Sequence, residues 1–184
     1  MGDIDEALER ADHEGFTRNP PRSIQARVTF LLKQLKSAKA VAQEIGVTAD
    51  SVNRYRRGAR KNPPKEVADR IDAAVRARWQ PRVRRRRREQ AAATTGITVE
   101  TRARFGYTAP VGSTDDGRVR RLTVHLPPAY ADRLFEAQRE GADDRLLRGI
   151  VAEGLQEIYF KDGGRRAQDL EVEFTDIDYF DVSF

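Results

Sequence analysis

The chain has 184 residues, of which 34% are charged, and its formal net charge is +5. It contains no cysteine, which excludes disulfides and thiolate metal sites, and its two histidines are too far apart to favour a shared zinc site. The sequence shows neither an apolar run of membrane-spanning length nor a secretory signal, so we expect a soluble, cytoplasmic protein without a membrane partner.

The positive charge lies in the first half of the chain. Residues 1–93 carry 22 Lys and Arg against 12 Asp and Glu, whereas residues 94–184 carry 12 against 17. This asymmetry suggests a polyanionic partner for the first half. Nucleic acid is the leading candidate, and an acidic membrane surface is the weaker one.

Residues 3–14 predict a short charged helix, and Ser23 can cap a second helix. The apolar residues of that helix recur at helical spacing and are Ile24, Val28, Leu31, Leu32 and Leu35. The segment SAKAVAQEIGVTADSVNRYRRG (37–58) then predicts two helices joined at Gly46, with Thr48 capping the second. This spacing resembles a helix-turn-helix at 38–57. A plain helical hairpin is the alternative, but the basic charge favours DNA binding.

The residues expected to contact DNA lie on the second helix of this pair and just beyond it. They are Thr48, Ser51, Asn53, Arg54, Arg56, Arg57, Arg60 and Lys61. Asn and Arg side chains can read base edges, and flanking Arg and Lys side chains bind phosphates.

An arginine-rich segment, RVRRRRREQAAA, follows a further amphipathic helix that carries Val67, Ile71, Val75 and Trp79. Contiguous cations repel one another unless a polyanion neutralises them, so we expect these arginines to bind a nucleic-acid backbone; the run does not distinguish DNA from RNA, and we assign it to DNA together with the helix-turn-helix. They are Arg82, Arg84, Arg85, Arg86, Arg87 and Arg88. The alternative is a solvated helix or a linker between the two halves.

The pattern changes after Gly96, where residues 97–107 suggest a strand and residues 121–126 alternate in the manner of a second strand. Two apolar helices follow at 130–140 and 144–160, with Asp143 placed to cap the second. A strand followed by two helices resembles the ribbon-helix-helix module, in which Arg121, Thr123 and His125 would face DNA bases and the helices would form a homodimer. Pairing of the strand within its own chain remains equally open.

These elements indicate a mainly α protein with a small α+β part. We expect a helical DNA-binding domain at 1–80, an Arg-rich helix or linker at 81–93, and a β-hairpin with two helices at 94–168. The acidic and aromatic residues of 169–184 favour a strand over a tail that docks a basic partner.

The segment PVGSTDDG (110–117) lies between the two predicted strands and carries two hydroxyls followed by Asp115 and Asp116. The chain has no nucleotide-binding Gly-rich loop, no Ser/His/Asp constellation and no metal-ligand pattern. We therefore expect neither an autonomous enzyme nor an intrinsic cofactor or metal. Two possibilities remain: a protein that binds nucleic acid, and a protein that is itself a substrate in a reaction on nucleic acid.

Six long segments across the chain resemble the telomere terminal proteins of linear streptomycete chromosomes and plasmids. They are GFTRNPPRSIQARV (15–28), FLLKQLKSAKAVAQEIGVT (30–48), ARWQPRVR (77–84), TTGITVETRARFGYTA (94–109), LTVHLPP (122–128) and EGLQEIYFKDGGRRA (153–167). The resemblance implies a protein that becomes covalently joined to the 5′ ends of linear DNA and primes the synthesis that fills the recessed end.

The resemblance also implies a site and partners. The hydroxyl of Thr114 would accept the first deoxynucleotide, dCMP, and Ser113 is the second candidate. A partner DNA polymerase would supply Mg²⁺ and use dCTP, and a separate telomere-associated protein would recognise the 3′ overhang. The protein would then be nucleoid-associated, at chromosome or plasmid ends.

Overall fold

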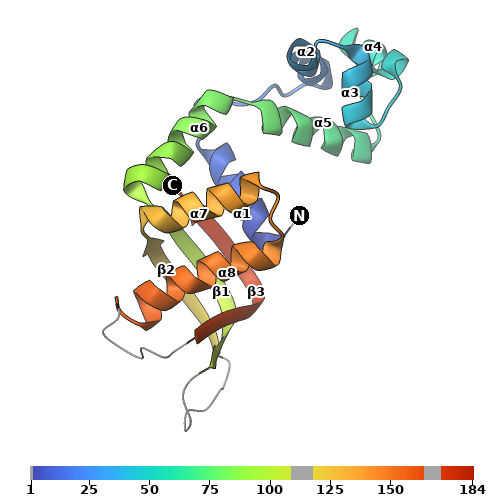
Figure 1. The fold of residues 1–184 in the computed structure, drawn as a ribbon. Helices are drawn as coiled ribbons and strands as arrows, with labels where there is room; N and C mark the ends of the chain where they lie inside the picture. The colour runs from blue at the N-terminus through green and yellow to red at the C-terminus, as the bar shows by residue number, and fades with distance from the viewer. Residues whose placement is uncertain (1, 109–117, 164–170) are drawn as a thin grey trace. The chain divides into compact units, whose positions relative to one another are not determined.

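The computed structural model of the chain describes residues 2–108, 118–163 and 171–184. Over these residues the protein is mainly helical with one three-stranded antiparallel sheet, which confirms the predicted class. The chain forms two compact units, each with its own hydrophobic core (Figure 1). Phe16–Pro81 form the first, and Met1–Gly15 together with Arg82–Phe184 form the second.

The helical unit contains four helices, which are α2 (Ile24–Leu35), α3 (Ala38–Ile45), α4 (Ala49–Arg56) and α5 (Lys65–Arg78). Their predicted apolar stripes meet in one core, whose least exposed residues are Val28, Leu31, Val41, Ile45, Val52, Tyr55, Ile71 and Val75. The Ser23 hydroxyl accepts a hydrogen bond from the Ala26 amide at 3.2 Å, as the predicted cap requires. Trp79 lies beyond the end of α5, where its ring packs edge-on against Phe30.

The sheet of the second unit has the order β2-β1-β3. Its central strand is β1 (Ile97–Thr108), flanked by β2 (Arg118–Leu126) and β3 (Glu171–Ser183), both antiparallel to it. Alternate residues of the strands are buried, which gives the sheet one apolar face. The buried apolar residues are Ile97, Val99, Ala103 and Phe105 of β1, Leu122, Val124 and Leu126 of β2, and Val172, Phe180 and Val182 of β3.

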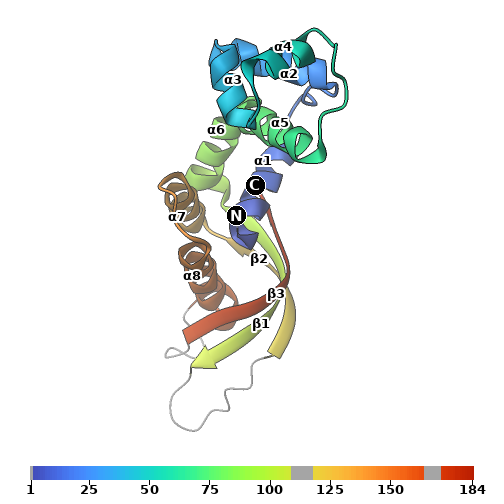
Figure 2. The same cartoon turned by 90° about the vertical axis from the view of Figure 1, so that its right-hand side faces the viewer.

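Two helices cover this apolar face, α7 (Pro128–Arg139) and α8 (Asp144–Leu155), and α8 continues into a π-helical turn, η2 (Gln156–Phe160) (Figure 2). Leu134 of α7 and Leu147, Val151 and Leu155 of α8 are fully buried in the shared core. The sequence suggested that so apolar a helix pair needs a surface from a second chain. In the structure the chain's own sheet supplies that surface.

Strand β3 confirms that the acidic-aromatic segment forms a strand at the edge of the sheet. Its register against β1 shifts twice, so that Tyr179 faces Arg102 and Ile177 faces Ala103. Asp178 and Asp176 are the extra residues at these two bulges, and Asp176 has a positive φ of 46°. The strand therefore keeps its apolar residues inward on both sides of the irregularity.

The first helix, α1 (Asp3–Glu14), belongs to the sheet unit, so the domain predicted at 1–80 is corrected at its start. Its residues Ile4, Ala7, Leu8 and Ala11 recur at helical spacing and are buried, and the first three lie in the same core as the sheet. Burial of this stripe is the physical reason for the correction, because the larger apolar surface is offered by the sheet and its helices.

From Arg82 onward, the segment predicted as a linker or separate helix at 81–93 is likewise part of the sheet unit. It forms α6 (Pro81–Gln90) and a π-helical turn, η1 (Ala91–Thr95), and Ala91 is fully buried in the core. Gly96 then turns the chain into β1 with a φ of 69°. A Cβ at this position would clash with the carbonyl oxygen of Leu126, so only glycine fits.

Among the helices that the structure describes, none combines the length and the apolar character that crossing a membrane requires.

Candidate nucleic-acid interface

A tight turn joins α3 to α4 in the helical unit. The hydroxyl of Ser37 caps α3, and Gly46 ends it in the left-handed conformation with a φ of 67°. The amide of Val47 donates to the carbonyl of Ala42 at 2.9 Å, which closes the turn. The hydroxyl of Thr48 then accepts from the Ser51 amide at 3.2 Å and caps α4. The predicted turn and cap are confirmed.

The predicted DNA contacts on and after α4 are largely presented to solvent. Thr48, Arg54, Arg56, Arg57, Arg60 and Lys61 are exposed, and Ser51 and Asn53 are half-buried. Arg54 is engaged with Asp50, one helical turn earlier, at 2.9 Å, and the Arg60 guanidinium lies 5.7 Å from the centre of the Tyr55 ring. Arg56, Arg57 and Lys61 have no ion-pair partner within the described part of the chain.

Three of these cations are therefore available to an outside partner. Arg56 and Arg57 lie at the end of α4, whose inner face, Val52 and Tyr55, is buried in the core, and Lys61 follows in the loop after this helix. Such an arrangement can bind phosphates at low cost, because no internal ion pair has to break first.

The arginine-rich helix α6 is divided between two opposite faces. Arg84, Arg87, Arg88 and Ala91 recur at the spacing of one helical face, as do Arg82, Arg85, Arg86 and Glu89. The second set is displaced from the first by two residues, or about 200° around the helix. The first set faces the interior of the sheet unit, and the second is exposed to solvent.

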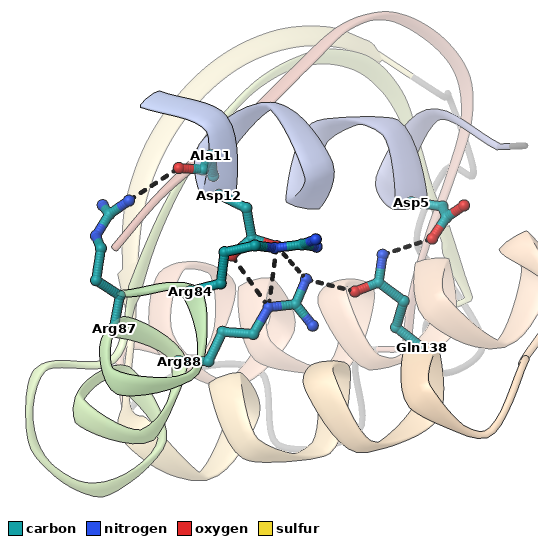
Figure 3. A network of polar contacts seen from close by, with 7 residues as sticks. All are labelled: Asp5, Ala11, Asp12, Arg84, Arg87, Arg88 and Gln138. Carbon is teal, nitrogen blue, oxygen red and sulfur yellow. Dashed lines mark hydrogen bonds and ion pairs between the residues drawn. The ribbon is translucent and has the colours of Figure 1, made fainter. Parts of the chain in front are cut away.

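The inner face of α6 binds a buried carboxylate (Figure 3). Asp12 of α1 is inaccessible to solvent, with 0% of its side chain exposed, and it accepts hydrogen bonds from Arg84 at 2.8 Å and Arg88 at 2.7 Å. Arg88 uses two of its nitrogens on this carboxylate, since its Nε lies 3.2 Å from Asp12 Oδ1. A buried carboxylate is tolerated only when it is paired and hydrogen-bonded in this way.

Further contacts extend this network to α7 and to Phe184, the residue after β3. The guanidinium of Arg88 lies 4.8 Å from the centre of the Phe135 ring and donates to Gln138 at 2.7 Å. Gln138 in turn donates to Asp5 of α1. Arg87 donates to the carbonyl oxygens of Ala11 and Phe184 and lies over the Phe184 ring.

Glu9 lies close to this network, and the charges of the network shift the pKa of its carboxyl. Burial raises the pKa of the Glu9 carboxyl, and the negative charges of Asp5 and Asp12 raise it further. The positive charges of Arg84 and Arg88 act in the opposite direction and only partly offset this rise.

The outer face of α6 has a different character. Arg82, Arg85 and Arg86 are exposed, and only Arg85 has an ion-pair partner among the described residues. That partner is Glu89, at 3.4 Å, and the two side chains are 75% and 67% exposed. Of the six arginines assigned to DNA from the sequence, the structure therefore leaves three facing solvent and uses three within the fold.

The strand residues assigned to a DNA-reading ribbon lie on the face of the sheet opposite its apolar face. The structure pairs β2 with β1 of the same chain, the arrangement that the sequence left open beside pairing with a second chain. Arg121 donates to Glu100 across the strands at 2.6 Å, and this hydrogen bond raises the pKa of Arg121. His125 Nδ1 lies 3.2 Å from the Thr98 hydroxyl. Thr123 is exposed between them.

The proposed acceptor hydroxyls of Ser113 and Thr114, with Asp115 and Asp116, lie outside the described residues. The flanking backbone is described, and it shows that residues 109–117 join two adjacent antiparallel strands, β1 and β2. Within the described ranges, no three His, Asp or Glu side chains gather as they would to hold a metal ion.

Comparison of the chain with family models, with curated proteins and with solved structures gave no match.

Asp12 is the residue of this region that the sequence analysis missed. The signal that could have revealed its position was the apolar stripe of α1, which ends at Ala11 and places residue 12 at the border of a buried face. Its arginine partners could not be found by pattern, because they lie more than 70 residues away in sequence.

Proposed function

We propose that this protein binds DNA through exposed cations and serves as a protein primer at the ends of linear DNA. The observation that carries the DNA-binding part is the capped helix α4, whose Arg56 and Arg57 are exposed and have no ion-pair partner in the described part of the chain. The α3–α4 pair then acts as a helix-turn-helix, with α4 placed against the DNA.

The priming part rests on the resemblance to telomere terminal proteins and on the position of Thr114 between two paired strands. In the proposed reaction the Thr114 hydroxyl oxygen attacks the α-phosphorus of dCTP. A new P–O bond forms, the bond from the α-phosphorus to the bridging oxygen breaks, and pyrophosphate leaves. A base in the partner polymerase takes the hydroxyl proton, and its two Mg²⁺ ions stabilise the developing charge.

The chain itself is then the acceptor substrate rather than the enzyme. A threonine hydroxyl is a weak nucleophile that must be activated by a base or a metal, which the polymerase site supplies. We further propose that the telomere-associated protein and the 3′ overhang place the DNA end beside this acceptor, and that the protein resides at the nucleoid.

Labelling with dCTP tests this proposal. The full chain is incubated with α-³²P-dCTP, Mg²⁺, the partner polymerase, a telomeric template and the telomere-associated protein, and covalent label is read after denaturing electrophoresis. We expect Thr114→Ala to lose the label and Ser113→Ala to keep it, with DNA binding unchanged in both. Full labelling of Thr114→Ala would refute the assigned acceptor.

The second candidate function is a non-covalent DNA-binding regulator. It is favoured by the compactness of the helical unit, which contains the α3–α4 pair and has a core of its own. DNA binding by the wild-type protein without any labelling in the complete system would select this alternative.

A further inference from the structure

The two faces of α6 differ in what their arginines can do. On the inner face the guanidinium groups of Arg84 and Arg88 are 21% exposed, and both bind the buried carboxylate of Asp12. If either arginine turned outward toward a phosphate, the Asp12 charge would lose a partner in a site without solvent. The inner arginines are therefore held in the fold and are unsuited to binding an external ligand.

Arg87 is also held within the fold, but by different contacts. Its two terminal nitrogens donate to the main-chain carbonyls of Ala11 in α1 and of Phe184 just after β3, and its guanidinium lies 5.1 Å from the centre of the Phe184 ring. These contacts join three segments that are distant in sequence. An arginine in this position contributes to packing as much as to charge.

The outer face has no such internal role. Arg82 and Arg86 are exposed and form no ion pair among the described residues, and the Arg85–Glu89 pair is screened by solvent. Arg82 and Arg86 stand four residues apart, or about 6 Å along the helix axis. Phosphates along one DNA strand are spaced about 3.4 Å apart along the duplex axis, so both arginines can reach the same backbone.

Among the described side chains of the acidic segment, none forms an ion pair with this face. The backbone of β3 pairs with β1, and Phe184, the residue after β3, contacts Arg87 on the inner face of α6. The outer face thus keeps a local excess of positive charge, three arginines against Glu89, and a polyanion complements it.

We propose that α6 binds the phosphate backbone of DNA through Arg82, Arg85 and Arg86 alone, while Arg84, Arg87 and Arg88 hold the fold together. This inference deepens the proposed function and rests on it, because it assigns the backbone-binding surface of the sheet unit. It also corrects the assignment of all six arginines to DNA.

The test measures binding of a fluorescein-labelled mixed-sequence DNA duplex to the full chain as a function of salt concentration. Arg82→Gln/Arg86→Gln removes two charges from the outer face. Arg139→Gln/Arg145→Gln removes two charges from exposed positions of α7 and α8 and is the matched control. Each phosphate contact contributes about 0.9 to the slope of log K against log salt.

We expect the magnitude of this slope to fall by about 1.8 in the outer-face variant, which corresponds to the loss of two phosphate contacts. The control should keep the wild-type slope. A third variant, Arg87→Gln, differs from Arg86→Gln only in the face it alters. We expect Arg87→Gln to lower the melting temperature and Arg86→Gln to lower the slope.

The outcomes separate the two proposals. If the wild-type protein does not bind DNA, the proposed function fails. If it binds and the Arg82→Gln/Arg86→Gln slope is unchanged, or falls no more than that of the control, the face assignment is overturned and the proposed function stands. Because this comparison uses exposed positions only, it remains decisive even where Arg87→Gln does not fold.

Discussion

Asp12 Oδ2 accepts a hydrogen bond from Arg88 Nη2 at 2.7 Å, although 76 residues separate the two in sequence. This contact joins α1 to α6. It adds a polar contact to the buried apolar stripe that holds the first helix in the sheet unit, and it explains why part of a strongly basic run is unavailable to an outside partner.

Removing the Asp12 charge should be costly. Asp12→Asn leaves Arg84 and Arg88 largely buried without their anion, and we expect a loss of about 3 kcal/mol in the free energy of unfolding. Urea denaturation measures it. The matched control is Asp50→Asn, which breaks the exposed pair with Arg54 and should cost about 0.5 kcal/mol or less. Equal losses in the two variants would contradict the role given to the Asp12 network.

The ionised form of Glu9 should destabilise the folded protein at neutral pH. Its folded-state pKa is raised, so its stabilising contribution is complete below the unfolded-state pKa and is lost as the pH rises through the folded-state value. Glu9→Gln keeps the neutral form at every pH. We expect its melting temperature to exceed that of the wild type at pH 7 and the difference to vanish in acid. A lower melting temperature at pH 7 would refute this.

Glu153, in the same unit, should affect stability with the opposite pH dependence. Hydrogen bonds from Arg133, at 2.8 and 2.7 Å, lower the pKa of Glu153. Its contribution to stability is therefore present above the unfolded-state pKa and is lost as the pH falls through the lowered value. Glu153→Gln should melt below the wild type at pH 7 and converge with it in acid. Because both side chains are about half exposed, the difference should be small.

Gly46 should be required for the α3–α4 turn. Its φ of 67° places it in the left-handed region, where alanine costs about 1 kcal/mol or more. A Cβ there would also meet the end of the Arg70 side chain, which is able to move away. The control is Gly149→Ala within α8, where a Cβ meets open space and alanine should stabilise by up to about 1 kcal/mol. Changes of the same sign in both variants would contradict the assigned geometry.

The exposed cations after α4 should bind DNA independently of those on α6. Arg56→Gln/Lys61→Gln should weaken duplex binding and lower the salt slope by about 1.8. The control is Lys65→Gln/Arg76→Gln on α5, where both cations already pair with aspartates one turn away. Fluorescence anisotropy at several salt concentrations measures both variants. Equal slopes for the two would place α4 outside the interface.

Much of the local structure could be predicted, because it depends on residues close together in sequence. The caps at Thr48 and Asp143 each involve a side chain and an amide three residues later, and the left-handed Gly46 follows from the turn itself. Apolar spacing likewise located the helices and strands, since burial of one face imposes the period of the element.

The candidate site was predictable only in part. The sequence by itself determined that positive charge gathers around the end of α4 and along α6, and that Thr114 lies between two predicted strands. For residues 169–184 it only favoured a strand over a docking tail. The tertiary structure decided which arginines remain free, because Arg84 and Arg86 are chemically identical and differ only in facing Asp12 or water. It also decided that β2 pairs within its own chain, since strand pairing depends on contacts between distant residues, whose partners no local pattern specifies.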